Sequence, residues 1–499
     1  MTSININKFP YEIFSSILTE AAKLNAQNSV QWTFGLSEPE LPLSNVRLHK
    51  YVRGRVPDEV LQWDSVADIR HTCSMWRHWA LRYALENIHI FKWRTSERWA
   101  ELTRNRSSYD VYELMDRLNG TYVRQPPYLS LDKTRELFMD YPSIASCVQR
   151  IWLNGFYVSE TDHKIFDTVN MCENLVSVSI PWTMLRRGTS TEWSKLLRAE
   201  SENPLQSLEL LAVDIPKDQK QQPENCIDTK PLQYRKVNFS KLKRLKIFGN
   251  TPFMPVCDAD LQAIARTATG LEEIHVSCLS TISIKGLVAL VKSSKGTIRV
   301  IEHAPRSKDG FYHPHPGELA PDSSTHLCDV LQSCTKLRDL SISMPSVCAN
   351  LFSNLNVKWT GELQVRALNL CPLAHQKTSS TAARIAAMSS LLDSARDLCK
   401  EVKRSHPAEH AESPLATEFF ISKCIFTPYT REVHGDFSSA RIRSNNALSA
   451  IQRFSTKGNY GSSGVYGMQL DDKEREAWEV LMEEEYFNAV EKGWIDVDV

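Results

Sequence analysis

The sequence predicts an α/β fold, in which a helical N-terminal part precedes a long repeating run of strands and helices. Apolar residues near the N-terminus recur at helical spacing. A six-residue apolar pattern recurs through the middle of the chain, and after residue 371 it gives way to the pattern of one long amphipathic helix. We therefore expect a helical segment, a curved solenoid of parallel strands and helices, and a C-terminal cap region.

The first predicted helix begins at Pro10. Proline at the first helical position and an acid, Glu12, in the first turn are both helix start signals. Ile13, Ile17 and Leu18 follow at helical spacing and indicate an apolar face.

A second helical segment runs from Ile69 toward Ile88. Its residues Cys73, Trp76 and Ala80 share one helical face with Ile69. The two segments are separated by residues 25–65, which is longer than an ordinary connection between neighbouring helices.

Together the two segments resemble the F-box, whose pattern is a Pro-x-Glu-Ile opening helix followed by an arginine, a cysteine and a Trp-Arg pair. An ordinary F-box has only a short turn between these parts, so residues 1–100 are interpreted as a split F-box with an insertion at 25–65. The resemblance implies binding to a Skp-type adaptor on a cullin scaffold, and seven residues are expected to form or support that surface: Phe9, Pro10, Ile13, Ile17, Leu18, Ile69 and Trp76. The alternative is a helical pair in which the tryptophans are only packed.

The repeating pattern in the middle of the chain has the form L-x-x-L-x-L with relaxed identity. Its instances start at residues 148, 175, 205, 242, 271, 298, 337 and 365, mostly 27 to 30 residues apart with two longer steps of 37 and 39. This series resembles the leucine-rich repeat and implies a solenoid over residues 146–371. An ordinary α/β domain remains the alternative, and residues 101–145 are expected to be a helical connector, with helices at 109–118 and 133–139.

The residues that flank the fourth position of each pattern should point away from the core, because side chains alternate along a strand. On this face we predict a target-binding surface formed by Arg150, Trp152, Arg244, Lys246, Glu273 and His275. Basic residues at 244 and 246 precede acidic ones from 273 onward, a gradient suited to orienting a partner.

Residues 372–499 are predicted to hold a cap helix over 381–403, a linker, a strand-like stretch near Phe419 and an acidic amphipathic helix after Asp471. The two long repeat steps correspond to insertions at 214–238 and 304–326. Insertions of this kind lie on one face of a solenoid.

Lys and Arg number 59, as do Asp and Glu, so no general attraction to nucleic acid or membrane is expected. No export signal or membrane span is visible, and the 12 cysteines form no Cys-x-x-Cys pair, which favours a reducing location, cytoplasmic or nuclear.

Catalytic and cofactor signatures are poor. The glycine run at 458–467 lacks the lysine of a phosphate-binding loop, and His313, His315, His326, Cys328 and Cys334 do not have the spacing of a zinc site. We therefore expect no catalytic residue, metal or cofactor. The predicted function is the substrate-recognition subunit of a cullin–RING ubiquitin ligase for an unidentified target protein, and the alternatives are a scaffold outside any ligase or, more weakly, an enzyme around His434.

Overall fold

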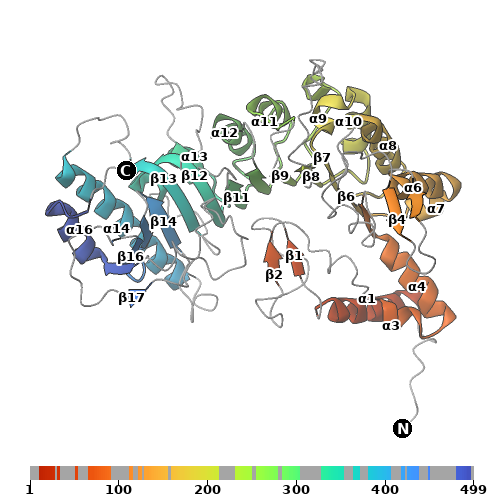
Figure 1. Ribbon diagram of the computed structural model, residues 1–499, viewed down its shortest axis with the longest axis horizontal. Coiled ribbons are helices and arrows are strands. Elements are labelled where there is room, and N and C mark those ends of the chain that lie inside the picture. Colours follow the sequence, from red (N-terminus) through yellow and green to blue (C-terminus); the bar gives the residue numbers. More distant parts are fainter. Residues whose placement is uncertain are drawn as a thin grey trace, which may run out of the picture. The chain divides into compact units, whose positions relative to one another are not determined.

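The computed structural model describes residues 10–27, 31–33, 51–53, 66–91, 112–115, 122–125, 128–154, 159–212, 231–249, 254–278, 282, 284–303, 327–352, 363–370, 380–405, 417–421, 424–435, 437, 448–449 and 479–495. It has an α/β fold with mostly parallel strands, which confirms the predicted fold class at this level (Figure 1). The chain divides into two compact units, residues 1–34 with 38–242 and residues 35–37 with 243–499.

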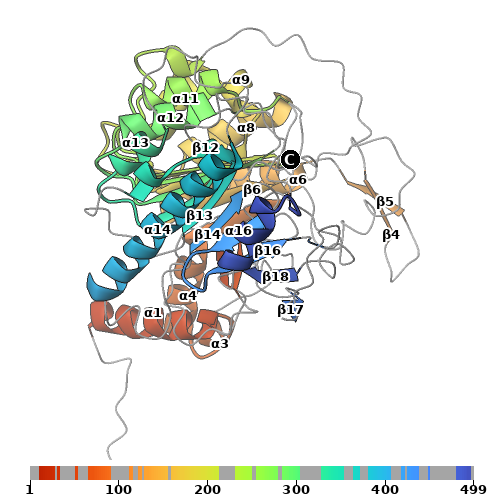
Figure 2. The same ribbon diagram turned by 90° about the vertical axis from the view of Figure 1, so that its left-hand side faces the viewer.

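The first unit contains parallel strands in the order β8-β7-β6-β3. Their bounds are β3 (Asn87–Phe91), β6 (Arg150–Asn154), β7 (Ser177–Pro181) and β8 (Ser207–Ala212). The helices that accompany them are α6 (Leu129–Asp140), α7 (Pro142–Ala145), α8 (Ser159–Asn170), α9 (Met184–Arg187) and α10 (Ser190–Leu197), with a 3-10 turn η3 (Pro231–Gln233). Figures 1 and 2 show α8 and α9 along one side of these strands, as short strand–helix–strand crossovers require.

The N-terminal part of this unit is helical, as predicted. It consists of α1 (Tyr11–Gln27), α3 (Ala67–Arg70) and α4 (Ser74–Leu85). Only Glu86 separates α4 from β3, and the Glu86 carbonyl oxygen accepts hydrogen bonds from the backbone N–H groups of Gln149 and Arg150 at 3.0 and 2.8 Å. The last helix of this part therefore continues directly into the sheet.

The second unit continues the repeating pattern and then changes direction. Its strands lie in the order β9-β10-β11-β12-β13-β14-β15-β16-β18-β17, and pairing is parallel up to β14 and antiparallel beyond it. The parallel strands are β9 (Arg244–Gly249), β10 (Glu273–Cys278), β11 (Val300–His303), β12 (Asp339–Val347), β13 (Leu363–Leu370) and β14 (Thr417–Ile421). The antiparallel strands are β15 (Cys424–Thr427), β16 (Glu432–Gly435), β17 (Leu448–Ser449) and β18 (Glu479–Met482).

Helices cover one side of the parallel strands in this unit, and Figure 1 shows α11 and α12 lying together there. The helical elements are α11 (Asp258–Ala265), α12 (Ile284–Ser293), α13 (Leu327–Gln332), η5 (Ala349–Phe352), α14 (Thr381–Ser405) and α16 (Glu483–Glu491). Four fully buried residues point toward this side and are paired in register from strand to strand: Leu245, Ile274, Ile301 and Leu340. The strand predicted at each apolar hexad is confirmed.

The predicted cap helix is present as α14. It buries Met388, Leu391, Leu392 and Ala395, contacts β13, and is tied to the C-terminal segment by Arg396, whose guanidinium donates to both carboxylate oxygens of Glu483 at 2.6 and 3.2 Å. A bidentate pair between arginine and a carboxylate adds geometric specificity as well as energy. α14 connects β13 to its parallel neighbour β14, so it does not end the sheet as a cap would, and the C-terminal region extends the sheet with further strands.

Two predictions about helices are wrong, one in the connector and one near the C-terminus. Residues 112–115, expected to be helical, form β4 (Tyr112–Met115), which pairs antiparallel with β5 (Tyr122–Gln125). The apolar and aromatic residues here fit a strand as well as a helix, and pairing with β5 decides between them. The acidic C-terminal helix is shorter than expected, because residues 479–482 form β18 before α16 begins.

Within the predicted insertion at 25–65, β1 (Gln31–Thr33) pairs in parallel with β2 (Tyr51–Arg53). Phe9, the glycine run at 458–467, His313, His315, His326 and most of both repeat insertions lie outside the described residues.

A buried carboxyl in the first unit has an unusual pKa. Asp162 on α8 is fully buried, and burial raises its pKa from 3.8 to about 7, although Arg187, 3.4 Å away, and the Thr183 hydroxyl favour the charged form. Between these two pH values the folded protein holds a proton that the unfolded chain has lost. Stability must therefore fall as the pH rises through this range.

The core of the second unit can be tested at Leu245. Leu245→Ala should lower the free energy of unfolding by about 2–5 kcal/mol, because it removes buried methyl groups and leaves a cavity. Leu137→Ala, at an exposed position of α6, is the matched control and should change it by less than about 0.5 kcal/mol. Urea unfolding of both variants measures the difference, and equal losses would contradict a core position for Leu245.

A second test concerns Asp162. Asp162→Asn removes the titrating carboxyl, so the variant should match the wild type near pH 4 and become more stable than it by about 4 kcal/mol above pH 7. Urea unfolding at a series of pH values measures the two curves. Asp167→Asn, at an exposed carboxylate of the same helix, is the control and should not reproduce this gain in stability. A slope unchanged in Asp162→Asn would show that the carboxyl is ionised in the folded protein.

Candidate interaction surfaces

The two parts of the interrupted N-terminal motif form one small core. Phe14, Leu18 and Ala22 of α1 are buried together with Val66, Ile69, Trp79 and Ala80. The Trp79 indole Nε1 donates a hydrogen bond to the Ser15 hydroxyl at 2.9 Å, which connects α4 with α1 across the insertion. The rings of Phe14 and Trp76 meet edge to face with centroids 6.3 Å apart.

The structure divides the predicted adaptor-binding residues into two groups. Leu18 and Ile69 are buried in the core just described, and Trp76 is half-buried against it. Pro10, Ile13 and Ile17 are exposed. Surface and support are thus separate: the exposed residues are available to a partner and the buried ones hold the helices together.

An apolar stripe lies on the exposed side of α1. Ile13, Ile17 and Leu24 are 49%, 37% and 59% exposed. Since each residue turns the helix by about 100°, these three positions fall within about 40° of one another. Leu24 was missed in the sequence, although it continues the spacing of Ile13 and Ile17.

The exposed side of α4, in the same group of N-terminal helices, adds a second surface that is partly apolar and partly basic. Met75 and Leu81 are exposed, and so are the basic side chains of Arg77, His78 and Arg82. Exposed apolar residues that occur singly are ordinary, but several on two packed helices mark a candidate interface.

The second candidate surface is a polar row on strands β9–β14, formed by residues that face away from the buried line of Leu245, Ile274, Ile301 and Leu340. One residue from each strand contributes, and successive members are register partners: Lys246, His275, Glu302, Ser341, Gln364 and Glu418. All except Glu418 are buried. Gln364 donates from Nε2 to the Glu418 carboxylate at 3.2 Å.

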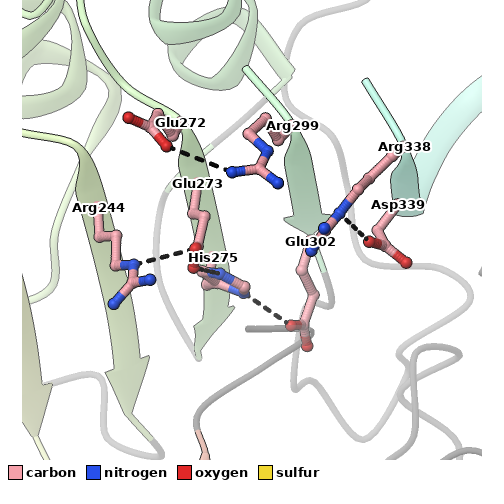
Figure 3. A network of polar contacts seen from close by, with 8 residues as sticks. All are labelled: Arg244, Glu272, Glu273, His275, Arg299, Glu302, Arg338 and Asp339. Carbon is pink, nitrogen blue, oxygen red and sulfur yellow. Dashed lines mark hydrogen bonds and ion pairs between the residues drawn. The ribbon is translucent and has the colours of Figure 1, made fainter. Parts of the chain in front are cut away.

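His275 joins two carboxylates within and beside this row, as Figure 3 shows. Its ring is fully buried, with Nδ1 3.1 Å from a Glu302 oxygen and Nε2 3.4 Å from a Glu273 oxygen. A neutral imidazole has one N–H, so only the doubly protonated ring donates to both carboxylates. Arg244 also donates to Glu273, from Nε at 2.9 Å.

These contacts determine the charge state of Glu273. Burial alone would raise the pKa of its carboxyl, but the hydrogen bond from His275 and the charges of His275, Arg244 and Lys246 outweigh burial and hold the pKa well below its usual value. Glu273 is therefore ionised in the folded protein, and its charge is neutralised by neighbours on β9 and β10.

The six predicted target-binding residues lie in two groups. Arg150 and Trp152 are on β6 in the first unit, and Arg244, Lys246, Glu273 and His275 are register partners on β9 and β10 in the second. Only Arg150 and Arg244 are partly exposed. The basic and acidic ends of the predicted gradient are paired with each other, as the contact between Arg244 and Glu273 demonstrates.

Other kinds of site find no support in the part of the chain that the structure describes. No group of three or more His, Cys, Asp or Glu side chains there is arranged to hold a metal ion, and no disulfide joins its cysteines. His434, the centre of the weaker enzymatic alternative, is buried on β16 with its Nε2 3.7 Å from Glu432. Among the described helices, none is both long and apolar enough to span a bilayer.

The Glu273 network can be tested by its pH dependence. Glu273→Gln should lower the free energy of unfolding by about 1–3 kcal/mol at pH 7, because it removes a buried charge partner of Arg244 and His275. The deficit should shrink below about pH 4.3, where the unfolded chain takes up a proton and the advantage of the low pKa disappears. Glu272→Gln, at a more exposed carboxylate with ion pairs of 3.8 Å, is the control and should cost less than about 1 kcal/mol. Equal deficits at pH 7, measured by urea unfolding, would contradict the special role of Glu273.

Comparison with known proteins adds no relative. A scan against models of protein families gave no match, and a search of curated proteins found none that matches this chain. The chain offers two candidate surfaces: the exposed apolar stripe on the N-terminal helices and the charged strands of the second unit.

Proposed function

We propose that this chain is the substrate-recognition subunit of a cullin–RING ubiquitin ligase, in which the N-terminal helices bind a Skp-type adaptor and the repeated strands bind a target protein. The observation that carries the proposal is the exposed apolar stripe of Ile13, Ile17 and Leu24 on a helix that already buries a second apolar stripe, Phe14, Leu18 and Ala22, against α3 and α4. Because the two N-terminal segments resemble a split F-box, we take the partner that binds this stripe to be the Skp-type adaptor.

The packing of α1 against α4 supports the split-motif interpretation. Residues 28–65 lie between the two segments in the chain, and yet Trp79 contacts Ser15 and Trp76 contacts Phe14. Insertion of a long segment into a loop costs little stability when the ends of the loop stay close. The adaptor-binding helices are therefore compatible with the inserted residues.

The repeated strands support the second half of the proposal. Each predicted leucine-rich hexad forms a strand, and the strands stack in parallel within each unit. Repeats of this kind provide extended binding surfaces.

The adaptor half is tested by pull-down of a purified Skp-type adaptor with the full chain. Ile13→Ala together with Ile17→Ala should weaken binding by about 2 kcal/mol or more, roughly thirtyfold, because apolar anchors dominate interface energies. Both side chains are exposed, so the fold should not change.

The matched control replaces Leu137 and Met139, which are similarly exposed on α6, with alanine and should bind the adaptor as the wild type does. Adaptor binding that is absent in the wild type, or unchanged in Ile13→Ala with Ile17→Ala, would overturn the proposal. The first of these outcomes would favour the alternative of an interaction scaffold that joins no ligase.

A further inference from the structure

A row of charged residues lies where the strands of the second unit begin. Lys243, Glu272, Arg299 and Arg338 each immediately precede a strand, and their backbones form a ladder. The N–H groups of Glu272, Arg299 and Arg338 donate to the carbonyl oxygens of Lys243, Glu272 and Arg299 at 2.6, 2.7 and 2.9 Å. Their side chains therefore succeed one another at the spacing of adjacent strands, about 4.8 Å.

Further basic residues surround this ladder. We define the basic edge, within the second unit, as Lys243, Arg244, Lys295, Arg299, Lys336 and Arg338. The acidic residues at the same positions of the four repeats are Glu272, Glu273 and Asp339. A surplus of positive charge is thus concentrated here in a chain whose formal net charge is zero.

The ion pairs along this edge are all oriented in the same way. In the pairs Lys243–Glu272, Arg299–Glu272, Arg244–Glu273 and Arg338–Asp339, the basic side chain is in each case the more exposed partner. Lys243 and Arg299 are 53% and 48% exposed, against 33% for the Glu272 between them. Figure 3 shows Arg244, Arg299 and Arg338 at the starts of β9, β11 and β12, with Glu272 and Glu273 at the start of β10 between Arg244 and Arg299.

From this arrangement we infer that the basic edge binds an acidic segment of a protein partner. The carboxylates hold the bases in place from the inner side, while the outward field is positive. The four strand starts span about 14 Å, which matches four or five residues of an extended peptide. Resting on the proposed function, the inference assigns the target a short run of acidic residues as the part that this edge recognises.

The edge differs from the polar row, where His275 and Glu302 are paired with each other and Lys246 is buried. Exposed guanidinium and ammonium groups lose little of their hydration free energy when they contact carboxylates. Such contacts determine the rate and orientation of association. The target therefore contacts the beginnings of the strands and not their middle.

The test measures binding of a fluorescein-labelled peptide of alternating glutamate and serine to the full chain by fluorescence anisotropy. The wild type should bind it in a salt-dependent manner, and a peptide of glutamine and serine should not bind. Lys243→Glu with Arg299→Glu should weaken binding at least about tenfold, since each reversal replaces an attraction by a repulsion. Thermal unfolding confirms that the variant is folded.

The matched control is Lys400→Glu with Lys403→Glu, which reverses two exposed lysines on α14 in the same unit and should bind as the wild type does. An equal loss in this control would overturn the inference, because it would assign binding to overall charge. Equal binding of the glutamine peptide would overturn it too, and so would tighter binding of a single-stranded DNA of the same charge, which would indicate nucleic acid.

Failure of this inference can be distinguished from failure of the proposed function by repeating the adaptor pull-down with Lys243→Glu and Arg299→Glu. Adaptor capture should be retained, because both residues belong to the second unit and the adaptor-binding helices to the first. If the wild type binds the peptide but does not capture the adaptor, the inferred binding site at the basic edge is supported and the proposed ligase function is overturned.

Discussion

The parallel register of the strands is the constraint on which the rest of the repeated region depends. Once Leu245, Ile274, Ile301 and Leu340 are aligned and buried on one side, alternation places the residues between them on the other side. Lys246, His275 and Glu302 thereby become neighbours whatever their chemistry. Because isolated buried charges are costly, opposite charges at matching positions of successive repeats are a condition of stability. The contacts among His275, Glu273 and Glu302 meet that condition.

Much of the fold could be predicted from the sequence, because burial constrains it most strongly. The hexads gave every strand from β6 to β13, and Leu245 and Ile274 are buried as expected. Exposure on the opposite side could not be predicted, since it depends on which other residues cover a strand. Arg244 and Glu273 were interpreted as opposite ends of a gradient, but the register makes them partners at 2.9 Å.

The N-terminal helix illustrates a similar ambiguity. α1 carries two apolar stripes, one of Phe14, Leu18 and Ala22 and the other of Ile13, Ile17 and Leu24. Helical periodicity detects both but cannot tell which is buried by the rest of the chain. The indole of Trp79 and the ring of Trp76 decide the question by packing on the first stripe. Only the tertiary contacts separate a core residue such as Leu18 from an exposed one such as Ile17.

The direct passage from α4 into β3 has a mechanical consequence. Glu86 is the single residue between them, and its carbonyl oxygen accepts hydrogen bonds from the N–H groups of Gln149 and Arg150, where the neighbouring strand β6 begins. A rotation of α4 would have to break these bonds or carry β3 and β6 with it. Whatever is attached to the N-terminal helices is therefore held at a fixed bearing and distance from the first strands, with no hinge at this junction. In an assembly built on this unit, the distance between a partner bound at the N-terminal helices and the first strands would be fixed by the fold and would not vary as it does across a flexible linker.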